Sequence, residues 1–559
     1  MFENSQFLTP VTLWKQFNID EPLLPSKLSE IRYDKTVYSE YFFSGRSTAT
    51  GRVRIYGLYV SQEDNKKRNA ILYIPGISEK MSYEYINEYA KLGYSVLAVD
   101  VYGKRTGGAE NHTVYPDDVS YANYETRGRR MDFADDNAKK TCWYEWVSVC
   151  KYALKFLKSL NVDKIGIVGL KTGADIAWQL AATEDGISLA VMLFGAGWYA
   201  YRGIPKYSDK DLVMDDERRR FVAAVDAHAY AQYVKCPVLY LTSTNNLDFD
   251  FDRANDTLAR INPEVERYFN YAPALDNYLD EYCKKDEEIF LAKYFGKSKK
   301  GLAKAPTVTA EQDGGYISVE VNFAEPEKVA ECKVYISEGS LVSAHRNWSS
   351  CAVKDDTDAV NGKIKFEYVV SGNFEQVFLF ASVKYKDGSG LSSKLIRKKT
   401  SGIPQKRANL IYSSINGLDG VTFYDKNSED NGVFVKTDDC LYLVKGADGI
   451  YGAYSPYGLI SYKLGEACAK ADENSIIKFD LYANEYCKLK LILALINDKT
   501  VEEYTLVKEI EAGEVWKNFT VSLGEFKSEE GRTIRDFKKI FALMIESESK
   551  YAVNNILLI

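Results

Sequence analysis

Histidine is scarce in this sequence, and other features that would assign a function at once are missing. The 559 residues include 3 histidines and 9 cysteines, and no two cysteines form a Cys-x-x-Cys pair. No apolar run reaches the about 18 residues that a membrane-spanning helix needs. These absences argue against a membrane-spanning protein. We interpret the odd, scattered cysteines as reduced thiols.

A strong excess of one charge is also absent. The chain has 79 acidic and 72 basic residues, which gives a net charge of -7 spread along its length. This balance argues against nucleic acid or an anionic membrane as a partner. The first residues have neither a basic segment nor an apolar core, so we expect no signal peptide and a cytoplasmic location.

The length and the changing pattern of the sequence predict three domains. Strands alternate with helices in residues 1–300, and a basic, Gly- and Pro-bearing linker follows Phe295. Residues 301–402 and 403–559 consist of short alternating runs divided by turn residues, which is typical of all-β sandwiches.

The first domain is expected to hold a mostly parallel sheet flanked by helices. Residues 1–35 are interpreted as an extended lead-in, and residues 36–43 and 52–60 as a hairpin. The alternation that follows predicts βαβ units. Its strands are expected at 70–74, 94–101, 165–168, 187–194, 238–242 and 265–271, and its helices at 83–92, 142–160, 174–182, 253–261 and 276–295.

The stretch KIGIVGLKTGADIAW organises this domain. A short apolar strand runs into Gly169-Leu170-Lys171-Thr172-Gly173, and a helix of small residues follows. This is the layout of a nucleophile elbow, G-x-S-x-G, which presents a serine on a strained turn. The two glycines stand where the pattern requires them, but the central residue is Lys171 rather than serine.

Four stretches in order resemble the α/β-hydrolase fold. They are ILYIPG, LGYSVLAVDVYG, the elbow GLKTG and CPVLYLTSTNNLDF. Within the fold they are most similar to the acetyl-xylan esterase, cephalosporin-C deacetylase and dienelactone hydrolase group. The resemblance implies a catalytic serine, an Asp or Glu, and a histidine, in that chain order, acting on esters.

The catalytic positions that the resemblance implies are degenerate. Lys171 replaces the nucleophile. The acid is expected after the strand 238–242, where Asp248 lies and where Asn245 and Asn246 occupy the place of an Asn-Asp pair in relatives. Asn277 occupies the position expected for the histidine. A serine needs an imidazole to take its proton, so this set cannot perform the usual chemistry.

Other residues offer no clear replacement. His112 lies in a Gly-rich loop, His228 precedes the acid-bearing strand, and His345 belongs to a later domain. A lysine nucleophile forms Schiff bases with carbonyl substrates, but nothing nearby indicates such a substrate. We interpret Lys171 as a charged residue that fills a vacated site, paired with Asp248 or Asp276.

The oxyanion hole depends on backbone and survives these substitutions. Its expected donors are the N–H groups of Ile77 and Thr172. With the lysine beside them, they predict a pocket for a small acyl or carboxylate ligand. No cofactor is expected.

The acidic run Asp248, Asp250 and Asp252 has the spacing of calcium-loop ligands. Arg253 stands where that loop requires glycine, and Ala259 where it requires glutamate. We therefore expect no metal, and interpret the acids as helix-capping and solvated. The charged run 215–220 is interpreted as a solvated helix in the lid.

The two β domains are expected to differ in role. Residues 301–402 indicate an immunoglobulin or fibronectin type III sandwich that serves as a spacer. Residues 403–559 resemble jelly-roll carbohydrate-binding modules, which hold sugars on aromatic rings. The most aromatic loop carries Tyr451, Tyr454 and Tyr457, the candidate sugar contacts.

Three functions are compatible with these observations. We favour a non-catalytic relative of carbohydrate esterases that binds a carbohydrate or a small acyl ligand. An active ester hydrolase with an unconventional site is the first alternative. The second is a structural subunit whose β domains bind a protein partner or another copy of the chain.

Overall fold

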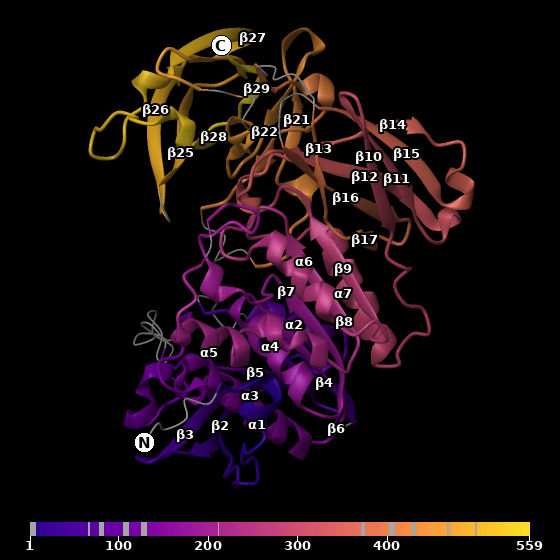
Figure 1. Cartoon of the computed structure of the whole chain (residues 1–559), viewed down its shortest axis with the longest axis vertical. Helices are drawn as coiled ribbons and strands as arrows, with labels where there is room; N and C mark the ends of the chain where they lie inside the picture. Colours follow the sequence, from indigo (N-terminus) through magenta and orange to yellow (C-terminus); the bar gives the residue numbers. More distant parts are fainter. Residues whose placement is uncertain are drawn as a thin grey trace.

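The structure is a computed structural model of the whole chain. It describes residues 7–64, 67–77, 83–103, 111–123, 131–210, 212–370, 375–401, 409–426, 432–466, 469, 471–497 and 500–559. Figure 1 shows an α/β region at the N-terminal end (the α/β region, residues 7–300) and two β regions side by side at the opposite end. We refer to these as the middle β region (residues 301–401) and the C-terminal β region (residues 409–559).

A mixed sheet forms the centre of the α/β region. Neighbouring strands are antiparallel from β1 to β5 in the sheet order and parallel from β5 to β9. The order is β1 (Ser26–Tyr33), β2 (Thr36–Ser47), β3 (Arg52–Gln62), β5 (Ser95–Val99), β4 (Arg68–Ile74), β6 (Val162–Leu170), β7 (Ile187–Leu193), β8 (Val238–Ser243) and β9 (Arg267–Ala272).

Helices cover both faces of this sheet. α3 (Cys142–Ser159) and α4 (Thr172–Thr183) pack against Leu72 and Ile74 of β4. Ile71 and Tyr73 of the same strand face α2 (Tyr83–Lys91) and α7 (Glu281–Tyr294). Side chains alternate along a strand, so one apolar strand supplies both cores. The predicted alternation of strands and helices is confirmed.

The N-terminal lead-in contains more structure than predicted. α1 (Pro10–Trp14) buries Leu13 and Trp14, and β1 pairs with β2 along its length. Nearly every residue of β1 is exposed, so its sequence carries no alternation of apolar and polar residues. The strand is defined by its pairing with β2 rather than by burial.

The charged run 215–220 also differs from the expected solvated helix. α5 (Asp216–Ala224) begins after Asp215, whose carboxylate accepts a hydrogen bond from the Arg218 N–H at 2.8 Å. Arg220 is buried, and its Nε donates to the Ala134 carbonyl at 3.2 Å. One face of this helix therefore packs into the α/β region.

The middle β region consists of antiparallel sheets. Apolar side chains from the two sheets meet in one core, as in a β-sandwich. The first sheet contains β10 (Thr307–Asp313), β11 (Tyr316–Asn322), β15 (Lys363–Val369) and β14 (Ala352–Asp355). The second contains β13 (Ser349–Ser350), β12 (Val329–Glu338), β16 (Gln376–Tyr385), β17 (Gly390–Ser392) and β18 (Ile396–Lys399).

The C-terminal β region is likewise built from antiparallel sheets. One contains β21 (Tyr442–Lys445), β22 (Tyr451–Tyr454), β29 (Ala552–Leu558), β24 (Ile476–Ala483), β27 (Gly513–Ser522) and β19 (Leu410–Tyr412). The other contains β20 (Thr422–Phe423), β23 (Leu459–Ser461), β28 (Ile540–Glu546), β25 (Cys487–Asn497) and β26 (Thr500–Ile510). Both β regions are therefore consistent with sandwich architectures.

Both β regions dock on the loops at the carboxyl edge of the central sheet. Arg346 forms a two-pronged ion pair with Asp252 of α6 (Phe251–Arg260), at 2.5 and 2.6 Å. The side chains are 0% and 1% exposed. From the C-terminal β region, Phe434 forms a parallel bridge with Leu279. The edge at which α/β folds bind ligands is thus partly covered by the β regions.

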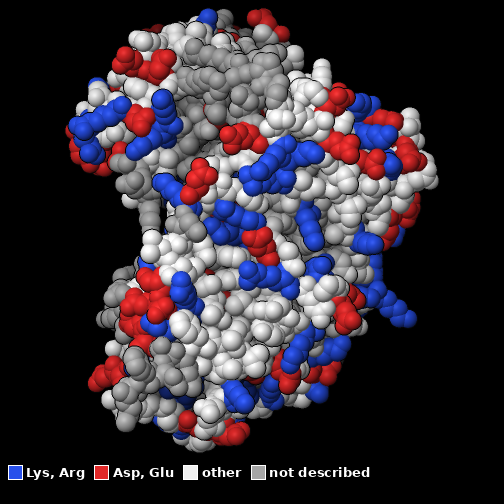
Figure 2. Space-filling model, viewed as in Figure 1, with Lys and Arg blue, Asp and Glu red and all other residues white. Residues whose placement is uncertain are grey.

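The surface carries both charges. Figure 2 shows basic and acidic side chains interspersed over the visible face. Among the helices in the described residues, none has the length and apolar character that a membrane crossing requires.

Candidate functional site

The elbow keeps the backbone of a nucleophile turn. Lys171 lies between the end of β6 and the start of α4, with φ 53° and ψ −118°. This conformation is costly for a residue with a side chain, by about 1–3 kcal/mol. The Lys171 N–H donates to the Leu193 carbonyl of the neighbouring strand at 2.8 Å. The turn is therefore fixed by the sheet, although its central residue is not serine.

The two glycines of the elbow are required by crowding. A Cβ on Gly169 would lie 2.4 Å from the Gly173 carbonyl oxygen, and one on Gly173 would lie 2.1 Å from the Ile74 carbonyl oxygen. Such approaches are open to glycine alone. The second contact also shows that the start of α4 abuts the end of β4, directly before the loop with Ile77.

The expected oxyanion donors lie on either side of that contact. Thr172 is the first residue of α4, and Ile77 follows β4 by three positions. Within the part of the chain that the structure describes, neither backbone N–H donates a hydrogen bond. The Thr172 side chain is occupied separately, since its hydroxyl accepts a 3.4 Å bond from the Tyr199 hydroxyl.

Lys171 lies within electrostatic range of Asp276. Burial raises the pKa of Asp276 to about 7, against the opposing effects of a hydrogen bond from the Leu247 N–H and the positive charge of Lys171. Lys171 itself is partly buried. A cation and a carboxyl group that titrates near neutral pH thus share the mouth of the elbow.

Asp248 is an exposed acid near the site, and besides burial its negative charge contributes to the raised pKa of Asp276. The Asp248 side chain is 68% exposed, and Arg202 approaches it only to 3.9 Å. Asn246, in contrast, is buried, at 2% exposed, as are its neighbours Thr244 and Asn245. The Asn246 Oδ1 accepts hydrogen bonds from the N–H groups of Asp248 and Phe249 at 2.9 and 3.0 Å. This turn fixes the Asn246 amide toward the loop after β9.

A hydrogen bond between Asn246 and Asn277 joins the loop after β8 to the loop after β9. The Asn246 Nδ2 donates to the Asn277 Oδ1 at 3.1 Å and to the Asp276 carbonyl at 3.0 Å. Two amides hold the loops together in this way, but neither ionises. The structure therefore brings Asn246 to Asn277, whereas the Asp248 carboxylate bonds to neither of them among the described residues.

The three histidines have other surroundings. His228 is buried, with its Nδ1 3.0 Å from an Asp226 oxygen and its ring stacked on Trp198 at 4.0 Å. His345 stacks on Phe541, and burial lowers its pKa to about 4. His112 is half-buried. Within the described residues, none of the three bonds to a hydroxyl or a thiol.

A buried carboxyl group beneath the elbow has no counterpart in the sequence analysis. Asp175, in the first turn of α4, is 1% exposed, and its Oδ1 accepts a 2.6 Å bond from the Gly197 N–H. Its Oδ2 has no partner among the described residues. Burial raises the pKa of Asp175 to about 8. In the sequence, the only signal for Asp175 was its position one helical turn after Lys171.

The acidic run after β8 serves the helix and the interface. Asp250 caps α6 by accepting hydrogen bonds from the N–H groups of Asp252 and Arg253 at 2.9 and 3.3 Å. Asp252 pairs with Arg346, and Asp248 remains at the surface. No group of three or more metal-ligating side chains forms within the residues described.

The three candidate tyrosines of the C-terminal β region do not form one cluster. Tyr451, 46% exposed, lines an open hollow of about 510 Å³ with Asn554 and Asn555. Tyr454 packs between Tyr442 and Tyr551, with ring centroids at 6.1 and 5.3 Å. Tyr457 lies near Phe423 instead. Tyr451 thus faces a hollow with polar neighbours, whereas Tyr454 and Tyr457 contact other aromatic rings.

Comparisons with known proteins agree with the fold. Residues 57–268, less than half of the chain, match the model of the Dienelactone hydrolase family. The α/β-hydrolase-like fold expected from the motifs is thereby confirmed for this region. No curated protein matches the chain.

Several solved structures match about half of this chain. Acetyl xylan esterase 1 from Thermoanaerobacterium sp. JW/SL YS485 is 18% identical, with a TM-score of 0.36, over 47% of this chain and 86% of its own. The acetyl xylan esterase from Paenibacillus sp. R4 is 14% identical, with a TM-score of 0.36, over 48% and 86%. A putative dienelactone hydrolase from Klebsiella pneumoniae subsp. pneumoniae MGH 78578 is 14% identical, with a TM-score of 0.32, over 47% and 100%.

Proposed function

We propose that this protein keeps the scaffold of an esterase without its chemistry, and that it binds an acyl, carboxylate or carbohydrate ligand instead of hydrolysing an ester. The observation that carries this proposal is the set of side chains at the three triad places, which are Lys171, Asn246 and Asn277. A charged lysine has no lone pair, and an amide does not take up a proton at neutral pH.

Acyl transfer at such an elbow requires a proton shuttle. The attacking hydroxyl must lose its proton to a base held within hydrogen-bonding distance, and the base is oriented by an acid. The amide pair of Asn246 and Asn277 supplies the orientation without the base. The loops after β8 and β9 therefore keep their arrangement, but the site has no base to accept the proton of an attacking hydroxyl.

The elbow is better suited to holding a small anion. The Lys171 ammonium supplies positive charge, and the N–H groups of Ile77 and Thr172, which donate to no other described residue, supply hydrogen-bond donors. Asp276 makes this binding depend on pH. Because its pKa is about 7, it becomes charged above neutral pH, where it competes with an anion for Lys171.

The hollow beside Tyr451 supports a carbohydrate contact. A half-exposed ring next to the side-chain amides of Asn554 and Asn555 offers a stacking face with hydrogen-bonding groups around it. Sugars are held by this combination of an aromatic face and polar groups. This contact is independent of the elbow.

An active ester hydrolase is the second candidate function. The family match over residues 57–268 favours it, and the strained backbone at Lys171 is the geometry that such enzymes use to present a nucleophile. In this case the proton would pass through a group other than histidine.

Calorimetric titration with sodium acetate at pH 6 and pH 8 tests the proposal. We expect heat with the full-length protein at pH 6, weaker binding at pH 8, and an affinity at least about tenfold lower for Lys171→Met. Lys91→Met, which changes an exposed lysine on α2, is the matched control and should bind as wild type does. No heat with wild type, or equal heat with Lys171→Met, would contradict anion binding at the elbow.

A further inference from the structure

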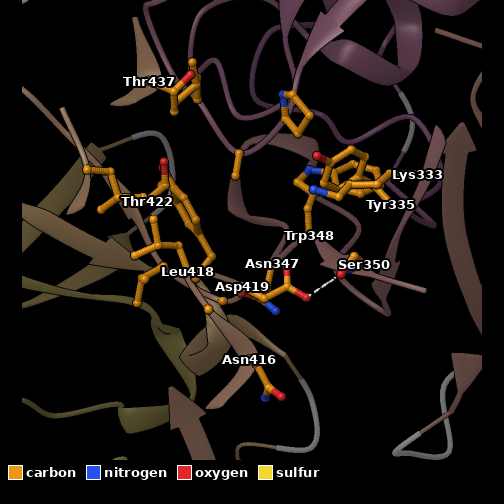
Figure 3. A pocket seen from close by; sticks show the side chains of 18 of the residues that line it. Lys333, Tyr335, Asn347, Trp348, Ser350, Asn416, Leu418, Asp419, Thr422 and Thr437 are labelled. Atoms are coloured by element: carbon orange, nitrogen blue, oxygen red, sulfur yellow. Dashed lines mark hydrogen bonds between the residues drawn. The ribbon is translucent and has the colours of Figure 1, made fainter. Parts of the chain in front are cut away.

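A cavity of about 420 Å³ lies where the three regions of the chain meet. The loop after β9, residues 273–275, forms one wall. The middle β region contributes Tyr335 and Trp348, and the C-terminal β region contributes residues 416–422 and Tyr462. Figure 3 shows Lys333, Tyr335 and Trp348 close together, with Asp419 and Ser350 near them. We refer to this space as the junction cavity. Its volume falls in the range of small-molecule sites.

Several polar groups on its walls have no partner in the protein. The hydroxyls of Tyr335 and Thr422 and the Oδ1 atom of Asp419 form no hydrogen bond among the described residues. The other oxygen of Asp419 is fixed, since it accepts hydrogen bonds from the Ser350 hydroxyl at 2.7 Å and the Ser350 N–H at 3.1 Å, the former dashed in Figure 3. The polar groups on the walls thus include one rigid acceptor and two hydroxyls.

The charges on the walls favour a neutral ligand. Lys333 and Lys384 both form ion pairs with Glu331, with their Nζ atoms 2.7 and 3.5 Å from its carboxylate oxygens. Asp280 is a second carboxyl group on the wall; burial raises its pKa, and it accepts a hydrogen bond from the Cys283 N–H at 2.9 Å. An anionic ligand would therefore meet Asp419 and Asp280, while the two lysines of the wall are already paired with Glu331. A cationic ligand would pair with Asp419 but would also lie beside the two lysines. Burying a charge without a partner is costly, so an anion is disfavoured, and a neutral ligand avoids repulsion from either sign.

The aromatic rings of the cavity are held in place. Tyr335 stacks on Phe380 with centroids 5.4 Å apart, and Trp348 meets the same ring edge-on at 5.1 Å. Tyr462 stacks on Phe541, and both rings belong to the C-terminal β region. Rings fixed in this way offer flat apolar surface at low entropic cost.

We infer that the junction cavity binds a neutral, hydroxyl-rich ligand of the size of a mono- or disaccharide. A hydroxyl both donates and accepts, so one ligand of this class satisfies the Asp419 acceptor and the Tyr335 and Thr422 hydroxyls together. A polyol also has apolar C–H faces for the rings. The site is separate from the elbow and from the hollow beside Tyr451, and it does not rest on the function proposed for either.

This ligand would touch all three regions at once. The wall formed by residues 273–275 continues directly into Asp276 and Asn277 of the elbow site. Binding would therefore hold the loop after β9 against both β regions and raise the thermal unfolding temperature of the whole chain.

Calorimetry on the full-length chain with xylose, glucose, xylobiose and cellobiose tests the inference. We expect at least one of these sugars to bind, and Asp419→Asn to weaken it about tenfold, because the amide presents a donor where the carboxylate presented an acceptor. Asparagine can still accept the Ser350 hydrogen bonds. Tyr335→Phe, which removes only a hydroxyl, should weaken binding about fivefold.

Matched controls separate this site from the others. Asp356→Asn and Tyr316→Phe change exposed residues of the middle β region and should leave binding unchanged. Tyr451→Ala and Lys171→Met should also leave it unchanged. The inference is overturned if none of the sugars binds, if Tyr451→Ala rather than Asp419→Asn abolishes binding, or if glutamate or glycine binds in their place.

Discussion

Two clusters of buried charged residues, the docking interface and the elbow, are built on different principles. At the interface, Asp252 and Arg346 are both buried and meet through two hydrogen bonds. Beneath the elbow, Asp175 is just as buried, but one of its oxygens has no partner among the described residues and burial raises its pKa to about 8.

This difference separates a structural role from a functional one. A contact that only holds two regions together pairs each charge, because an unpaired buried charge costs several kcal/mol. The elbow instead combines a strained lysine backbone with a buried carboxyl oxygen that has no partner among the described residues. Such costly features cluster at binding and catalytic sites. The predictions below test this contrast.

Breaking the interface pair should have the largest effect. Arg346→Met leaves Asp252 buried without its cation and should lower the free energy of unfolding by about 3–5 kcal/mol, measured by urea denaturation. The double variant Arg346→Met with Asp252→Leu should recover most of this loss. A single variant that costs less than about 1 kcal/mol would show that the interface does not depend on the pair.

Rebuilding the triad comes next. Lys171→Ser combined with Asn246→Asp and Asn277→His should hydrolyse p-nitrophenyl acetate about 100-fold faster than Lys171→Ser alone, because a general base contributes at least that factor. The control variant carries Lys171→Ser, Asn277→His and Asp248→Glu, and keeps Asn246. Equal hydrolysis rates for the two triple variants would mean that Asn246 does not occupy the acid position.

The buried carboxyl beneath the elbow should make stability depend on pH. The pKa of Asp175 is raised in the folded state, so its favourable contribution is complete below its unfolded pKa near 4 and is lost as pH rises toward 8. Asp175→Asn should therefore be more stable than wild type at pH 8 by about 2 kcal/mol, and this gain should shrink toward pH 5. A gain that is the same at both pH values would contradict a titrating Asp175.

The smallest effect is expected at the surface. Asp248→Asn removes a pair with Arg202 in which both side chains are largely exposed, so stability should change by less than about 0.5 kcal/mol. Acetate binding should not change either. A marked loss of stability or of acetate binding would show that Asp248, rather than Asn246, belongs to the site.

The elbow and its sheet were predictable because their signals are local. Gly169 and Gly173 flank Lys171 at a fixed spacing, because a Cβ at either position would clash with backbone atoms. Buried strands such as β6 appear in the sequence as apolar runs. β1 gave no such signal, since its side chains are exposed on both faces.

The acid position shows where local signals end. Asn246 and Asp248 are two residues apart, and which of them faces Asn277 is decided by the turn that the Asn246 side chain closes with the Asp248 and Phe249 N–H groups. The junction cavity was out of reach for another reason. Its walls come from segments that are close only after three regions have docked.

The central claim is that the elbow has lost its reaction, and the rate of p-nitrophenyl acetate hydrolysis by the wild-type chain tests it most directly. With micromolar protein at pH 7.5, we expect a rate equal to that of Lys171→Met and of buffer with an inert protein. Saturable turnover that Lys171→Met abolishes would show that the site is an active esterase.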